Sequence, residues 1–270
     1  MKLNAPNRGV NRKGLVKGLL LCTTLTLLLS LAFGLWFSMT RGYSAVVTPE
    51  DIAMIQLDAP QAGAPVAVMH TDAGDMAFLL YPEEAPQTVE NFCTLARQGY
   101  YDGSYVFRVE PEIFFSAGAP NADGTVPDPD AASERVPREL SAKLWPLRGA
   151  LCALTTKTEA GFFRTLTGKQ RYYSGSRFLV ADTIEMTDEI REGLLSQNEN
   201  ETQNLVANAF LEKGGIPNYS QQIAVFGQLI DGYDILDAIT ASELTGTENA
   251  MRPKEDIRIL SIEITEYPAD

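Results

Sequence analysis

Hydrophobic and polar positions along the middle of the chain form short runs that predict β-strands. Two runs, PVAVMH at 65–70 and DMAFLLY at 75–81, flank TDAG, and Gly74 in this connection is typical of a hairpin turn. Turn residues separate the runs, with no regular alternation of strands and helices, so the pattern predicts a mainly β protein with a closed antiparallel barrel. The other expected strands occupy residues 105–109, 113–117, 149–154, 177–182, 223–230 and 257–267.

A helical spacing follows the first hairpin, in EAPQTVENFCTLARQG. Pro86 suits the first turn of a helix and Gly99 suits a left-handed stop. Residues 187–213 are expected to form one or two surface helices, residues 233–241 a short helix, and the Pro-, Asp- and Ala-rich residues 119–147 a long surface loop. The apolar residues that share one face of the first helix are Val89, Phe92, Cys93 and Ala96.

An uncharged apolar run, GLLLCTTLTLLLSLAFGLWFSM, occupies residues 18–39. At about 1.5 Å per residue, a helix of this length spans a bilayer. Most of the positive charges near it precede it, which predicts a cytoplasmic N-terminus and an exported body. A cleaved signal peptide is the alternative, although the run is long for one. We expect a cytoplasmic basic tail at 1–17, a transmembrane signal anchor at 18–39, a linker at 40–64 and a globular domain at 65–267.

Charge is distributed unevenly along the chain. The first 49 residues hold six basic residues and no acidic one, so the remaining 16 basic and 35 acidic residues give the body a net charge of −19. A body this acidic argues against nucleic-acid binding, which requires basic surface to neutralise phosphates. We expect an acidic, solvated surface.

Cysteine and histidine are too sparse for a metal centre. The three cysteines form no CxxC pair, and His70 is the only histidine. Buried free thiols at Cys93 and Cys152 are expected, with a disulfide between them as the alternative. A histidine-based catalytic triad is not expected.

The order of motifs resembles the cyclophilins, the cyclosporin-type peptidyl-prolyl cis-trans isomerases. The resemblance rests on VAVMHTDAGDMAFLLYPEEAPQTVENFCTLARQGYYDGSYVFRV, then RGALCAL, SGSRFLVA and PNYSQQIAVFGQLIDGYDILDAI. It extends from about residue 65 to residue 266, and GGIP at 214–217 is similar to bacterial exported members. It implies an eight-stranded antiparallel β-barrel capped by two helices.

The resemblance implies that Arg108, in VFRV, is the catalytic residue. Peptide-bond rotation has a barrier of roughly 18–20 kcal/mol because the C–N bond is partly double. A guanidinium that donates a hydrogen bond to the prolyl nitrogen acts when resonance is lost, so the bond belongs to the transition state. This chemistry requires neither a metal nor an organic cofactor. The alternative is a strand arginine paired with a surface carboxylate.

The resemblance also implies a substrate groove, and several of its positions depart from the family. Ser116 replaces a glutamine and is too short to reach the same place. Ile223 stands where the family has a histidine, and Asn218 stands where it has a tryptophan or a histidine. Phe178 suits the core as well as the groove, and Arg177 suggests a preference for acidic or C-terminal carboxylate groups. The expected substrate-binding residues are Phe107, Ile113, Phe114, Ser116, Leu154, Arg177, Phe178, Leu179 and Ile223.

Two functions fit this mixture of retained and lost positions. The first is a membrane-anchored extracytoplasmic prolyl isomerase of weak activity, which assists folding by acting on proline-containing segments of exported client proteins. The second is a non-catalytic cyclophilin-like module that binds extended client segments as a chaperone or scaffold. A structural wall or membrane component without a peptide pocket is a third possibility.

Overall fold

The computed structural model describes residues 51–126, 136–157, 172–196, 201–247 and 251–269. The expected basic tail, the apolar run at 18–39 and the linker as far as residue 50 lie outside these residues. Within them, no helix has the length and apolarity needed to cross a membrane.

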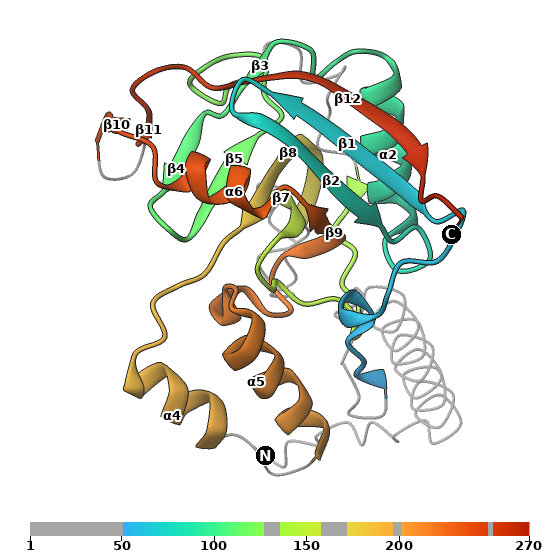
Figure 1. The fold of residues 1–270 in the computed structure, drawn as a ribbon, viewed down its shortest axis with the longest axis vertical. Coiled ribbons are helices and arrows are strands. Elements are labelled where there is room, and N and C mark those ends of the chain that lie inside the picture. Colours follow the sequence, from blue (N-terminus) through green and yellow to red (C-terminus); the bar gives the residue numbers. More distant parts are fainter. Residues whose placement is uncertain (1–50, 127–135, 158–171, 197–200, 248–250, 270) are drawn as a thin grey trace, which may run out of the picture. The chain divides into compact units, whose positions relative to one another are not determined.

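A curled, half-barrel antiparallel sheet forms the centre of the domain (Figure 1). Every strand pairing in it is antiparallel, which confirms the mainly β prediction, while closure into a barrel stays a prediction. A two-stranded sheet of β10 (Leu244–Thr245) and β11 (Arg252–Pro253) is separate. The main sheet runs β3 (Ser104–Tyr105), β12 (Arg258–Glu266), β1 (Pro65–Thr71), β2 (Gly74–Leu80), β9 (Ala224–Asp231), β7 (Ala150–Lys157), β8 (Tyr172–Ala181), β5 (Phe114–Ala117) and β4 (Arg108–Glu110), with β6 (Val136–Pro137) on β8.

Four α-helices lie among the described residues, two of them packed on the sheet. The helices α2 (Pro86–Arg97) and α6 (Tyr233–Thr240) contact sheet strands and contribute to the core inside the curl. The other two, α4 (Asp188–Ser196) and α5 (Glu201–Lys213), contact each other and stand in the insert between β8 and β9 (Figure 1). Two short 3₁₀ turns complete the elements: η2 (Ile55–Leu57) and η3 (Pro217–Tyr219).

The N-terminus of α2 is capped by a residue distant in sequence. The residue at the cap position, Ala85, has no side chain that can accept a hydrogen bond. Instead, the Glu139 carboxylate accepts the backbone N–H of Gln87 at 3.2 Å, the backbone N–H of Thr88 at 2.9 Å and the Thr88 hydroxyl at 2.8 Å. A carboxylate at this end of a helix satisfies free N–H groups and complements the helix dipole. The expected surface loop at 119–147 is thereby fastened to α2.

Strand alternation divides the apolar side chains between two faces of the sheet. The inner cluster includes the predicted buried face of α2 and aromatic rings from β5, β8 and β9. A second, outer cluster covers the opposite face of β5, β7, β8 and β9. Because successive side chains of a strand point to opposite faces, each of these strands contributes to both clusters.

The described end of the expected linker packs against the domain. Met54 is buried, and the Gln56 amide donates to the Trp145 carbonyl at 2.9 Å and to the Gln228 side chain at 2.8 Å. The Gln56 side-chain oxygen also accepts the backbone N–H of Trp145 at 2.6 Å. The short apolar patch around Ile55 therefore fixes this segment on the fold.

Cys93 and Cys152 are free thiols, as expected, and are buried in different clusters. Cys93 belongs to the inner cluster and Cys152 to the outer one, so the sheet lies between them. Burial raises the pKa of each thiol. Both side chains therefore behave as apolar packing groups at neutral pH.

Candidate active site

A groove of about 560 Å³ opens on the outer face of the sheet. Its walls come from β4, β5, β7, β8 and the segment between η3 and β9. Most of the expected site residues lie in it, together with four that the sequence did not predict. The lining residues are Phe107, Arg108, Phe114, Ser116, Leu154, Thr155, Thr156, Arg177, Leu179, Tyr219, Gln222 and Ile223.

Strand register brings the central residues of the groove into one row. Arg108 on β4 pairs with Ser116 on β5, and Ser116 pairs with Leu179 on β8. Directly opposed residues of antiparallel strands share a face. The row continues through Cys152 on β7, which pairs with Leu179. Arg108 therefore stands at one end of a row whose other side chains are uncharged.

Two neighbours hold the Arg108 side chain at the rim of the groove. Its Nη2 donates to the Glu110 carboxylate at 3.3 Å, and its guanidinium carbon lies 5.5 Å from the centroid of the Phe114 ring. Arg108 and Glu110 are two residues apart on one strand, so their side chains share a face. The Arg108 side chain keeps 40% exposure, which leaves donors available to a molecule in the groove.

The floor of the groove is apolar. Phe114 and Leu179 are buried, while Leu154 and Ile223 are half-buried, and all four belong to the outer cluster. Ser116 is also buried. The floor therefore offers hydrocarbon surface suited to a proline ring, with Arg108 as a cation at its edge.

Two expected groove residues do not line it, and both require correction. Phe178 is 1% exposed and faces the inner cluster, because it alternates on β8 with Arg177 and Leu179. Ile113 lies in the turn before β5, where its N–H donates to the Glu110 carbonyl at 3.0 Å. It packs against the outer cluster but does not line the groove.

A polar rim complements this floor. Arg177 donates through Nη2 to the Thr156 hydroxyl at 3.1 Å, and Thr155 lies beside Thr156 on β7. These threonines were not among the predicted groove residues, although they follow Leu154 directly in LTT.

The position expected for Asn218 is also corrected. Tyr219, an exposed aromatic residue, lines the groove, whereas Asn218 lines a different cavity. Tyr219 lies four residues before Ile223, close to the point where the family has a ring side chain. This spacing was the signal in the sequence that could have identified it.

No group of three or more histidine, cysteine, aspartate or glutamate side chains that could hold a metal occurs in the part of the chain that the structure describes. The charged side chains of the groove lining are Arg108 and Arg177.

Comparison with known proteins identifies the family. Residues 66–264 match the family model described as cyclophilin type peptidyl-prolyl cis-trans isomerase/CLD. The chain also resembles a cyclophilin type peptidyl-prolyl cis-trans isomerase of Cryptosporidium parvum, with a TM-score of 0.51 at 18% sequence identity. That alignment covers 76% of this chain and 99% of the other, and it shows the shared fold.

Bacterial relatives are closer in sequence. A Staphylococcus saprophyticus protein, provisionally named as a peptidyl-prolyl cis-trans isomerase, is 35% identical over 74% of this chain and 91% of its own. A Staphylococcus aureus relative with the same provisional name is 34% identical over 76% of this chain and 94% of its own length. A Streptococcus pyogenes protein, provisionally named as a bifunctional phosphatase/peptidyl-prolyl cis-trans isomerase, is 32% identical over 80% of this chain but only 42% of its own length. The chain thus belongs to the cyclophilin-type peptidyl-prolyl cis-trans isomerases.

Proposed function

We propose that the groove binds a proline-containing segment and that Arg108 catalyses isomerisation of its prolyl bond. The observation that supports this most strongly is the position of the guanidinium, at the edge of an apolar floor and partly exposed toward it. The proline ring rests on Phe114 and Leu179. Its acyl side then rotates while the ring is held.

The catalytic step is the stabilisation of a transient lone pair. As the bond twists, the prolyl nitrogen loses resonance with the carbonyl and becomes a hydrogen-bond acceptor. Arg108 donates to it at that moment, so the interaction lowers the barrier without tightening ground-state binding. One charge-assisted hydrogen bond contributes about 1.5–3 kcal/mol. That converts to a rate factor of roughly 10- to 150-fold.

The activity we propose is weak. Ser116 has no amide with which to hold the substrate backbone and steady the arginine, and each lost hydrogen-bond partner costs about 1 kcal/mol. We further propose that the enzyme acts outside the cytoplasm on exported proteins, anchored by residues 18–39, and that the sheet closes into a barrel. The uncharged run and the positive charges before it support the anchor.

A non-catalytic peptide-binding module is the second candidate. The observation in its favour is the Arg108–Glu110 pair, because a guanidinium occupied by a carboxylate resembles an ordinary strand arginine. In this case the groove would hold extended segments without accelerating isomerisation. A rate measurement separates the two candidates.

The test is isomerisation of a short Ala-Pro-Phe-type peptide by the full chain. Arg108→Ala is expected to lower kcat/KM by about 10- to 150-fold, because the transition-state donor is removed. Arg252→Ala is the matched control, since its side chain is equally exposed (41% against 40%) and lies outside the groove lining. A folded parent that gives no acceleration would leave the binding module as the function.

A further inference from the structure

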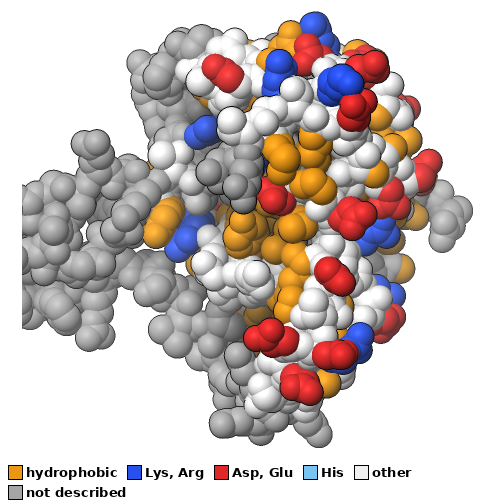
Figure 2. Space-filling view, turned by 90° about the vertical axis from the view of Figure 1, so that its left-hand side faces the viewer, with side chains coloured by type: hydrophobic (Ala, Val, Ile, Leu, Met, Phe, Trp, Pro, Cys, Tyr) orange, Lys and Arg blue, Asp and Glu red, His pale blue; other side chains and the backbone are white. Residues whose placement is uncertain are grey.

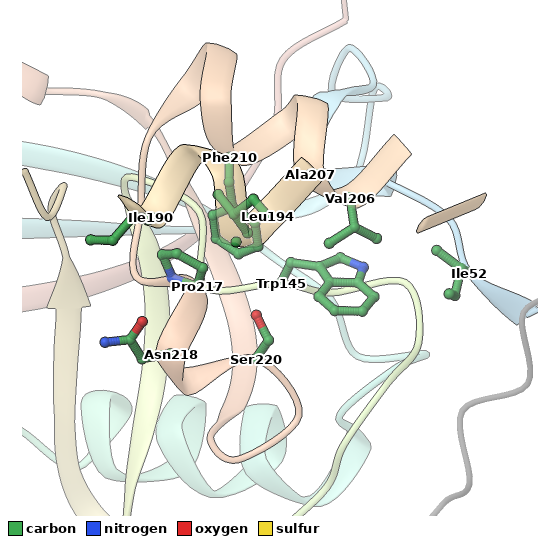
Figure 3. A pocket seen from close by; sticks show the side chains of 11 residues that line it. Ile52, Trp145, Ile190, Leu194, Val206, Ala207, Phe210, Pro217, Asn218 and Ser220 are labelled. Atoms are coloured by element: carbon green, nitrogen blue, oxygen red, sulfur yellow. The ribbon is translucent and has the colours of Figure 1, made fainter. Parts of the chain in front are cut away.

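A second cavity, of about 500 Å³, lies beneath the inserted helices (Figure 3). Figure 3 shows side chains from five separate segments around a common space: Ile52 before η2, Trp145 before β7, the helices α4 and α5, and the η3 turn. Neither the family assignment nor the proposed catalytic step gives this cavity a role. Its lining residues are Ile52, Trp145, Ile190, Gly193, Leu194, Val206, Ala207, Phe210, Pro217, Asn218 and Ser220.

The lining of this cavity is mainly apolar, and its polar side chains, Asn218 and Ser220, both lie on the side of η3. The indole N–H of Trp145 donates to the carbonyls of Ala53 at 3.2 Å and Ala142 at 3.1 Å, so its hydrogen-bonding capacity is already used. Phe210 is almost fully buried, and Leu194 and Val206 pack against the same cluster. Protein interiors are normally close-packed, and a water molecule in apolar surroundings finds few partners. An apolar side chain is therefore the occupant that this lining favours.

The cavity and the groove share one wall. Asn218 and Ser220 line the cavity, while Tyr219 and Gln222 line the groove. An α-helix with its side chains is roughly 10 Å across, and the 3₁₀ turn η3 in this wall is wound more tightly. An extended segment advances about 3.3 Å per residue, so it crosses this wall in about three residues. A segment in the groove can thus place a neighbouring side chain in the cavity.

We propose that the cavity is a subsite for one aliphatic or aromatic side chain of the client segment whose proline lies in the groove. The inference rests on the proposed function in one respect, which is that the segment bound in the cavity is the segment whose proline lies in the groove. The helices α4 and α5 create the subsite, because they close it on the side away from the sheet. The preferred client is then an unfolded segment with an apolar residue close to its proline, a sequence that becomes buried once the client folds.

A leucine scan in synthetic peptides tests this subsite. Each peptide carries one proline in an alanine background, with a single leucine placed two to five residues from the proline on either side. The protein is the full chain with Trp36→Phe, which leaves Trp145 as the only tryptophan. At one position, leucine is expected to raise kcat/KM about 10-fold over the all-alanine peptide and to change Trp145 fluorescence on binding.

Two variants on α4 provide the matched comparison. A Cβ at Gly193 meets open space, so Gly193→Phe adds a ring at the cavity without a clash of its Cβ. This variant is expected to abolish the leucine increment, which is the ratio of kcat/KM for the leucine peptide to kcat/KM for the all-alanine peptide. Leu195→Phe, on the same helix but exposed and outside the lining, is expected to retain it.

The outcomes separate the subsite from the catalytic proposal. If leucine has no effect at any position, or if Gly193→Phe keeps the increment, the subsite is overturned even when the all-alanine peptide is isomerised. If no peptide is isomerised but the leucine peptide still binds more tightly by fluorescence, and Gly193→Phe removes this difference, the catalytic proposal fails and the subsite stands.

Discussion

At the scale of single residues, the site depends on how one guanidinium is held. Ser116, which lies opposite Arg108, has no amide to offer, and the carboxylate of Glu110 makes the observed contact instead. Exposed ion pairs of this kind contribute about 0.2–1 kcal/mol. Their effect on the rate comes from restricting a long side chain that would otherwise have to be ordered in the transition state.

Glu110 is therefore expected to act as a positioning residue for Arg108. We expect Glu110→Ala to lower kcat for a short proline peptide by about 3- to 5-fold with little change in KM, since this contact orders the donor rather than the substrate. Glu110→Gln keeps a hydrogen-bond acceptor and is expected to recover most of the rate. An unchanged or higher rate in Glu110→Ala would show that the carboxylate competes with the prolyl nitrogen for Arg108.

At the scale of elements, β8 separates the groove from the core. Phe178 points inward and packs against Phe92 and Tyr101, with ring centroids 5.7 and 5.8 Å away. Arg177 and Leu179 on either side point outward into the groove. One strand therefore contributes both to the inner cluster and to the lining of the groove.

We expect Phe178→Ala to destabilise the protein by about 3–5 kcal/mol through loss of buried surface and formation of a cavity. The measurement is the urea midpoint, followed by circular dichroism. Leu205→Ala, at an exposed position of α5, is the control and is expected to stay within about 0.5 kcal/mol of the parent. A small effect of Phe178→Ala would contradict its assignment to the core.

The periodic elements were predictable from sequence, and the long-range polar contacts were not. The buried face of α2 and the hairpin at Gly74 follow from spacing and turn residues that are local in the chain. The cap by Glu139 joins residues 51 positions apart, so no local pattern reveals it. The inward direction of Phe178 depends on strand register, and the register between two distant strands cannot be predicted from the sequence of either strand alone.

At the scale of the whole molecule, acidic charge predominates. The chain has a net charge of −13, and Figure 2 shows acidic side chains distributed around a band of apolar ones on one face. Some carboxylates also fasten the loop before β7 to the rest of the fold. Glu84 accepts hydrogen bonds from Ser141 at 2.6 Å and from Lys143 at 2.7 Å.

This contact predicts a pH dependence of stability. Burial raises the pKa of Glu84, but the hydrogen bonds from Lys143 and Ser141 outweigh burial and hold the pKa below its ordinary value. A pKa lowered by folding stabilises the protein above the ordinary value of 4.5, and the contribution is lost as pH falls through the lowered pKa. We expect Glu84→Gln to cost about 1 kcal/mol or less at pH 7.

The corresponding measurement is urea unfolding of both proteins at pH 7 and at about pH 3. The difference between parent and Glu84→Gln is expected to shrink at the lower pH. Glu90→Gln, at an exposed position on α2, serves as the control and is expected to track the parent throughout. A difference that stays constant with pH would mean that the Glu84 carboxylate does not carry the effect.

The two-sided arrangement of β8 also bears on how such a protein changes over evolutionary time. A substitution at Arg177 changes a side chain that lines the groove, whereas the rings around Phe178 lie on the other face of the strand. The lining of the groove can therefore change by single substitutions while the inner cluster keeps its packing. Related proteins with this strand can thus differ in the surface of the groove while they keep the same fold.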